Sequence, residues 1–250
     1  MRCYLFFLAV IFFLKSFSQK NELSISSIVN NVYNPERIQS IKQLKKSKGF
    51  TRIKIDYEKK ISTILHFDYN LKKFDTLISS LNSGIPFFTE YNFSRDEKKI
   101  LLETETDKIY RRSKQSIYFV YDTQIKKINK VFVDKIQEPV FSPNGNKVAF
   151  IYRRNIYVKD LLNNKTEKIT NDGNYQILNG ITDWVYEEEF GFVRAFDWSP
   201  DSKNIAYIKF DESKVPIFSM DIYGSDLYQF PYMFRYPKAG ENNSIVSIKL

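Results

Sequence analysis

Apolar and polar residues alternate along much of the chain with a period of two. This period is expected of β-strands, because successive side chains point to opposite faces. The alternation is clearest at 51–57 and 116–121, where β-branched and aromatic residues are frequent. Turn-forming residues separate such runs, as at 143–146. Helical periodicity is confined to short segments at 23–30 and 186–191. The pattern predicts an all-β fold with a short acidic helical turn.

One strand–turn–strand unit occurs three times in the sequence. Its copies begin at Phe93, Phe141 and Trp198, and each contains an aromatic residue, a serine, a polar turn, a lysine and an apolar strand. The serine can form hydrogen bonds back to the turn backbone. The copies lie 48 and 57 residues apart, near the period of four-stranded propeller blades. The repeat therefore predicts a β-propeller, with a stack of unrelated hairpins as the alternative.

The length of the chain limits the number of blades. At about 50 residues a blade, the 232 residues of 19–250 supply only four or five blades. A closed propeller hides its strand edges, whereas the run 244–250 resembles a strand in which the sequence stops. We therefore expect residues 19–250 to form a partial propeller that is incomplete at its C-terminus.

The first eighteen residues have the organisation of a secretory signal peptide. Arg2 supplies a positive start, residues 4–14 are apolar, and Ser16 and Ser18 are small residues suited to a cleavage site. We expect cleavage after Ser18 and a secreted or periplasmic protein, with an uncleaved membrane anchor as the alternative. The only cysteine, Cys3, lies in this segment, so the remaining chain has no disulfide.

Composition excludes several classes of function. Hydrophobic residues make up 43% of the chain, which excludes a disordered protein. The net charge is +9, but lysines are scattered among acidic residues and form no basic stripe, so a nucleic-acid partner is not expected. The single histidine, His66, lies in an alternating run and is interpreted as a strand residue rather than a general base. We expect neither a metal nor a cofactor.

Three consecutive carboxylates, Glu187, Glu188 and Glu189, lie between aromatic residues in a chain of opposite net charge. Adjacent carboxylates repel, so holding two together requires a cation or hydrogen-bond donors nearby. A substrate ammonium group would meet this requirement through charge-assisted hydrogen bonds. The alternative is a solvated acidic turn with no ligand.

Several motifs around this acidic run resemble one family. They are Asp-Trp-Val-Tyr-Glu-Glu-Glu at 183–189, Trp-Ser-Pro-Asp at 198–201 and Tyr-Pro-Lys-Ala-Gly at 236–240. In this order they resemble the dipeptidyl peptidase IV family, serine exopeptidases of the prolyl oligopeptidase clan. The resemblance covers roughly residues 35–250 and is strongest from about residue 139.

The resemblance implies a fold and a set of site residues. Family members join an eight-bladed N-terminal propeller to a C-terminal α/β-hydrolase domain and release Xaa-Pro or Xaa-Ala dipeptides from free N-termini. The resemblance assigns the substrate ammonium to Glu188 and Glu189, and a backbone carbonyl of the substrate to Arg111. The neighbouring Arg112 is the alternative to Arg111.

The catalytic half of such an enzyme is expected to be absent from these residues. No Gly-x-Ser-x-Gly sequence occurs, and His66 is the only histidine. We therefore expect the chain to recognise peptide N-termini but to be inactive alone, with hydrolysis carried out by a missing C-terminal domain. The family's frequent homodimers imply a dimer of the full-length protein. The rival interpretations are a non-catalytic secreted binding propeller and a nucleic-acid binder.

Overall fold

The computed structural model describes residues 23–35, 40–81 and 84–250, so the predicted signal peptide lies outside the described residues. The chain divides into two compact units, Met1–Ile38 and Gln39–Leu250. In the first unit, the helix α2 covers Ile25–Val29, within the helix predicted at 23–30. Its N-cap, Ser24, accepts a hydrogen bond from the backbone N–H of Ser27.

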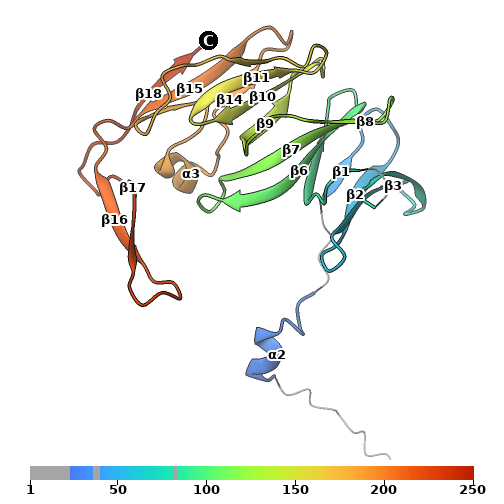
Figure 1. Cartoon of the computed structure of the whole chain (residues 1–250), viewed down its shortest axis with the longest axis horizontal. Helices are drawn as coiled ribbons and strands as arrows, with labels where there is room; N and C mark the ends of the chain where they lie inside the picture. The colour runs from blue at the N-terminus through green and yellow to red at the C-terminus, as the bar shows by residue number, and fades with distance from the viewer. Residues whose placement is uncertain (1–22, 36–39, 82–83) are drawn as a thin grey trace, which may run out of the picture. The chain divides into compact units, whose positions relative to one another are not determined.

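The second unit begins with three antiparallel sheets, each of four strands joined in chain order. The first sheet contains β1 (Ile41–Gln43), β2 (Phe50–Asp56), β3 (Ile61–Phe67) and β4 (Lys73–Ser79). The second contains β5 (Glu90–Phe93), β6 (Lys99–Lys108), β7 (Lys114–Asp122) and β8 (Lys127–Lys130). The third contains β9 (Gln137–Phe141), β10 (Lys147–Tyr152), β11 (Asn155–Asp160) and β12 (Thr166–Lys168). Figure 1 shows these sheets following one another along an arc.

The fourth sheet is interrupted by two insertions. Its central strand, β15 (Ile205–Asp211), pairs with β13 (Ile177–Asn179), β14 (Phe196–Trp198) and β18 (Ile245–Lys249). The helix α3 (Trp184–Phe190) is inserted between β13 and β14. A hairpin of β16 (Ile217–Ile222) and β17 (Phe230–Arg235) is inserted between β15 and β18 and extends from the sheets (Figure 1).

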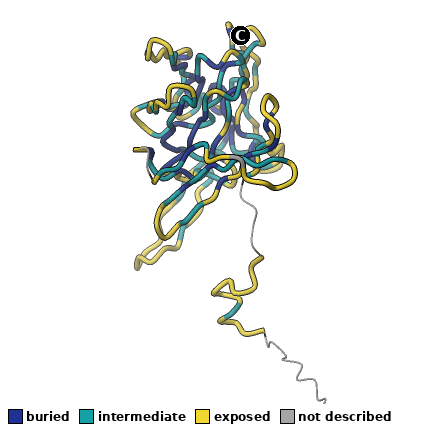
Figure 2. The backbone as a smooth tube through the Cα atoms, turned by 90° about the vertical axis from the view of Figure 1, so that its right-hand side faces the viewer, coloured by how far each residue is buried: buried dark blue, intermediate teal, exposed yellow. Residues whose placement is uncertain are grey.

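Neighbouring sheets pack face to face because their middle strands are apolar on both faces. In β6, Ile100 and Leu102 enter the core between the first and second sheets, whereas Leu101 enters the core between the second and third. Residues 148–151 of β10 alternate in the same way between two cores. Each fully buried aliphatic side chain contributes about 2 kcal/mol. Figure 2 shows this buried backbone in the interior of the second unit.

The three repeated units form the turns expected of them. In each, the serine side chain donates to a carboxylate or amide oxygen two residues later, as from Ser142 to Asn144 at 2.8 Å. The same serine accepts the backbone N–H five residues later, at 3.0 Å for Lys147. The repeated motif therefore fixes the tight turn between two antiparallel strands of one sheet: β5 and β6, β9 and β10, and β14 and β15.

The predicted all-β fold is confirmed, with 47% strand and 5% helix. His66 lies in strand β3, as predicted. The run at 244–250 contains β18. Among the described residues, no helix combines the length and apolar character needed to cross a membrane.

Candidate functional site

The acidic run 187–189 lies on α3, whose ends are fixed by local sequence. The side chain of Asp183 caps the helix by accepting a hydrogen bond from the backbone N–H of Tyr186 at 2.9 Å. Asp183 also accepts a hydrogen bond from the hydroxyl of Ser244. At the other end Gly191 adopts φ = 74°, a left-handed conformation that glycine tolerates well. The predicted helical turn is confirmed, although it begins at Trp184.

Aromatic side chains hold α3 on two sides. Tyr186 packs edge-on against Phe210 of β15, with ring centroids 4.9 Å apart. Trp184 packs edge-on against Tyr236, with centroids 4.8 Å apart, and also contacts Phe234 of β17. Such aromatic pairs stabilise a packing beyond the area they bury. The direction of each glutamate on α3 is therefore set by the two neighbouring elements.

The three glutamates occupy different environments because successive helical residues are rotated by about 100°. Glu187 is only 1% exposed. The side chain of Glu188 is 12% exposed. Glu189 is exposed to solvent. One run of three identical residues thus supplies an interior carboxylate, a half-buried carboxylate and a surface carboxylate.

The structure places Arg111 beside Glu188. The Arg111 Nε atom lies 3.1 Å from Oε2 of Glu188, and the arginine side chain is 73% exposed. Arg111 belongs to the loop between β6 and β7, which is closed by a hydrogen bond from Ile109 N–H to the Ser113 carbonyl at 2.9 Å. The side chain of Arg112 extends toward Gly191, where a Cβ atom would lie 3.7 Å from its Cζ. Among the described residues, the arginine side chain that pairs with a glutamate of the acidic run is therefore that of Arg111.

Glu189 lies on another flank of α3. It lines a hollow of about 260 Å³ together with Trp184, Val185, Tyr236 and Lys238. Among the described residues, the ion pair of α3 involves Glu188 rather than Glu189. Arg111 and Glu188 thus form a preformed charged pair, whereas Glu189 lines a hollow to which neither of these two residues contributes. The assignment of these three residues to a substrate stays a prediction.

Residues 94–250 match the family described as "Dipeptidyl peptidase IV (DPP IV) N-terminal region". The chain belongs to this family. The resemblance inferred from the motifs at 183–189, 198–201 and 236–240 is therefore confirmed.

The chain is also similar to individual curated proteins named as dipeptidyl peptidases or prolyl endopeptidases. The chain is 36% identical to mouse prolyl endopeptidase FAP over 190 residues, covering 72% of this chain and 24% of that protein. It is 35% identical to cat dipeptidyl peptidase 4 over 165 residues, covering 64% of this chain and 22% of that protein. The chain thus spans about a quarter of the length of these curated relatives.

A solved structure confirms the propeller fold. The crystal structure of Porphyromonas gingivalis dipeptidyl peptidase 4 matches with a TM-score of 0.81 and 33% identity, over 90% of this chain and 33% of that chain. The predicted partial propeller is therefore confirmed, with four sheets and the separate two-stranded β16–β17 hairpin in the described part of this dipeptidyl peptidase IV family chain.

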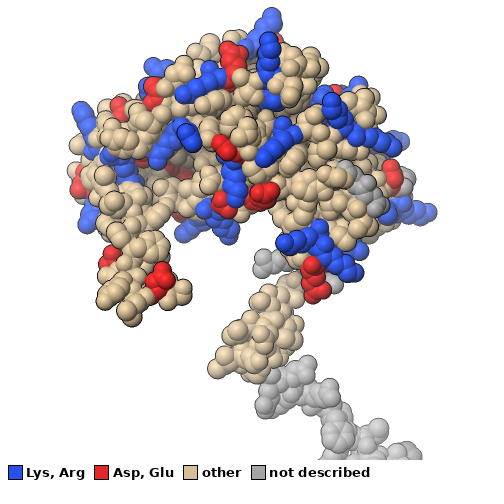
Figure 3. Space-filling view, in the orientation of Figure 1, with Lys and Arg blue, Asp and Glu red and all other residues tan. Residues whose placement is uncertain are grey.

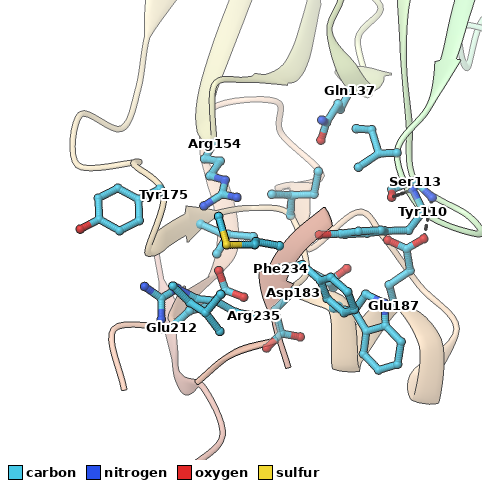
Figure 4. Close-up of a pocket in the computed structure, with 17 residues that line it drawn as sticks. Tyr110, Ser113, Gln137, Arg154, Tyr175, Asp183, Glu187, Glu212, Phe234 and Arg235 are labelled. Atoms are coloured by element: carbon cyan, nitrogen blue, oxygen red, sulfur yellow. Dashed lines mark hydrogen bonds between the residues drawn. The ribbon is translucent and has the colours of Figure 1, made fainter. Parts of the chain in front are cut away.

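A cavity that the sequence did not predict lies between α3 and the base of the β16–β17 hairpin. Its volume is about 300 Å³, and apolar and aromatic side chains form most of its wall. Five charged residues also line it: Arg154, Asp183, Glu187, Glu212 and Arg235 (Figure 4). Arg154, Glu212 and Arg235 come from separate parts of the chain and look like ordinary surface charges in the sequence. No local signal could have grouped them.

Burial raises the pKa of Glu212 to about 7, although Arg154 and Arg235 favour its ionised form. The residue is 6% exposed. Nearby Asp183 raises the pKa of Glu212 further, because it repels the ionised carboxylate. A carboxyl group whose pKa is higher in the folded than in the unfolded protein favours folding when protonated.

We expect Glu212→Gln to change how stability depends on pH. The contribution of Glu212 is fully present below its ordinary pKa of 4.5 and is lost as pH rises toward 7. The substitution by neutral glutamine should therefore be more favourable to the free energy of unfolding at pH 8 than at pH 5, by about 2–3 kcal/mol. Urea unfolding at both pH values measures this, with exposed Glu167→Gln as control. An equal effect of Glu212→Gln at the two pH values would contradict the prediction.

Proposed function

We propose that this chain binds the free amino end of a peptide, as the N-terminal region of a dipeptidyl peptidase. In this proposal Glu188 and Glu189 accept hydrogen bonds from the α-ammonium group, and Arg111 donates to a backbone carbonyl. The observation that carries the proposal is the Arg111–Glu188 contact, 3.1 Å long. It joins the β6–β7 loop to α3 and brings a guanidinium and a carboxylate side by side, which supports their use as donor and acceptor for one peptide backbone.

The chemistry of this pair suits a peptide terminus. Arg111 uses Nε toward Glu188, which leaves its terminal N–H groups for a carbonyl oxygen. Glu188 contacts Arg111 through Oε2, so Oε1 is left for an ammonium group. Because Glu188 and Arg111 lie at a fixed separation, both charge-assisted contacts can form only with a peptide whose amine and first carbonyl are the matching distance apart. A peptide whose amine is blocked would lose the first contact.

Charge on the surface supports a peptide ligand over a nucleic acid. On the face shown in Figure 3, acidic side chains are interspersed among the basic ones. A nucleic-acid interface requires a continuous basic path along the phosphate backbone. The net charge of +9 is therefore consistent with basic residues dispersed over the surface.

Hydrolysis belongs, in this proposal, to an α/β-hydrolase domain outside these 250 residues. The curated relatives are about four times as long as the matched region, and two are named as a dipeptidyl peptidase and a prolyl endopeptidase. A serine of that domain would attack the carbonyl of the second residue of the bound peptide. Cleavage of the predicted signal peptide at 1–18 would locate this activity outside the cytoplasm.

Titration with a short peptide tests the proposal. The full chain, labelled with ¹⁵N, is titrated with Gly-Pro-NH₂ and with N-acetyl-Gly-Pro-NH₂ and followed by NMR. We expect the free amine to bind with a Kd of about 1–10 mM and to shift signals of α3 and the β6–β7 loop. The acetylated peptide should bind at least about tenfold more weakly, because it has no ammonium group. Equal affinity for the two peptides would overturn the proposal.

A further inference from the structure

Glu187, the first of the three glutamates, is buried and contacts the loop that carries Arg111. Its Oε1 atom accepts hydrogen bonds from the backbone N–H groups of Arg112 and Ser113, each at 2.7 Å. The residue is 1% exposed. Figure 4 shows the carboxylate of Glu187 directed at Ser113 from α3. These contacts join segments 74 and 75 residues apart in the sequence.

A buried carboxylate requires compensation, because removing its charge from water costs several kcal/mol. The two short backbone donors supply it, and hydrogen bonds to charged groups are stronger than those between neutral groups. Glu187 also lies in the first turn of α3, where the helix dipole favours an acidic residue. The interaction is therefore strong enough to fix the loop against the helix.

The position of this contact determines where Arg111 lies. The loop donates through two adjacent peptide groups, at 112 and 113, and Arg111 is the residue directly before them. The helix accepts at 187, and Glu188 is the residue directly after. The side chain of Arg111 is 73% exposed, and exposed ion pairs contribute only about 0–1 kcal/mol to stability. The ion pair alone would therefore not hold Arg111 beside Glu188. The fixed backbone on both sides keeps Arg111 and Glu188 within 3.1 Å.

We infer that Glu187 is a positioning residue that holds the β6–β7 loop against α3, so that Arg111 and Glu188 present one rigid peptide-binding pair. The inference rests on the proposed function for its consequence, peptide affinity. The geometry it concerns is independent of any peptide. The three consecutive glutamates then have separate tasks: Glu187 acts on the loop, and Glu188 and Glu189 act on the ligand.

The ¹⁵N-labelled full chain tests the geometry without ligand. The Nε–H group of Arg111 gives its own NMR signal, and its exchange with water reports how firmly Glu188 holds it. We expect exchange to accelerate about tenfold in Glu187→Ala and in Glu187→Asp, whose carboxylate is one methylene shorter. Glu187→Gln keeps an Oε1 acceptor and should stay within about twofold of the parent. Exposed Glu105→Gln on β6 is the matched control.

Titration of the same variants with Gly-Pro-NH₂ measures the consequence. Affinity should fall about tenfold in Glu187→Ala and Glu187→Asp, because the Arg111–Glu188 pair is then no longer preformed and has to be assembled on binding. It should recover in Glu187→Gln. Unchanged exchange and affinity in folded Glu187→Ala and Glu187→Asp would overturn the inference. So would a Glu187→Gln variant as damaged as Glu187→Ala. If Glu187→Ala does not fold, Glu187→Asp decides.

The two readouts separate this inference from the proposed function. Faster Arg111 exchange in Glu187→Asp supports the positioning role even if the parent chain binds no peptide. That combination would reject the peptide-binding function alone. Peptide binding by the parent with Arg111 exchange unaffected in Glu187→Asp would reject the positioning role alone.

Discussion

Replacing both Glu188 and Glu189 by glutamine is expected to lower kcat/KM for a dipeptide substrate by at least about 100-fold, because two charge-assisted contacts are lost. The assay uses a chimera in which residues 40–250 replace the matching region of Porphyromonas gingivalis dipeptidyl peptidase 4, a protein of 33% identity and TM-score 0.81. Hydrolysis of Gly-Pro-p-nitroanilide gives the rate. Glutamine has nearly the same shape, so the fold should persist.

A matched control separates the site from the change in charge. Glu105→Gln together with Glu167→Gln also removes two negative charges, but from exposed strand positions. We expect this control to retain kcat/KM within about twofold, because exposed charges far from a ligand are screened by salt. Unchanged kinetics in the Glu188→Gln, Glu189→Gln chimera would exclude both residues from substrate binding.

Much of the fold could be predicted because a local pattern determines it. Alternation identified the strands, and the serine-containing turn marked where two antiparallel strands of a sheet join. The β16–β17 hairpin was not predicted, since its residues also alternate but its strands pair only with each other. Whether a strand joins a neighbouring sheet depends on packing partners far away in the sequence, and alternation does not report them.

The site could be predicted only in part. The acidic run and its resemblance to the family predicted Glu188 and Arg111 as site residues, and these two side chains are in contact in the structure. The separate environment of Glu187 depends on the rotation of α3, which the packing of Trp184 and Tyr186 sets. No spacing rule shows which of three identical neighbours faces inward. For the same reason the cavity around Glu212 had no signal in the sequence.

Separate alanine substitutions of Arg111 and Arg112 test which of these adjacent arginines contacts the backbone carbonyl of the substrate. Arg111→Ala in the chimera should lower kcat/KM for Gly-Pro-p-nitroanilide by about thirtyfold, which corresponds to about 2 kcal/mol for a lost charge-assisted hydrogen bond. Arg112→Ala should have an effect of less than about threefold, because its side chain lies toward Gly191.

The comparison is informative because Arg112→Ala keeps the contacts of its own backbone. Its N–H would still donate to Glu187, so the β6–β7 loop should keep its place against α3. Both variants lose one positive charge from the same loop, so a general electrostatic effect on substrate approach would lower both rates equally. A larger loss in Arg112→Ala than in Arg111→Ala would reverse the assignment, and the contact between Arg111 and Glu188 would then have no role in substrate binding.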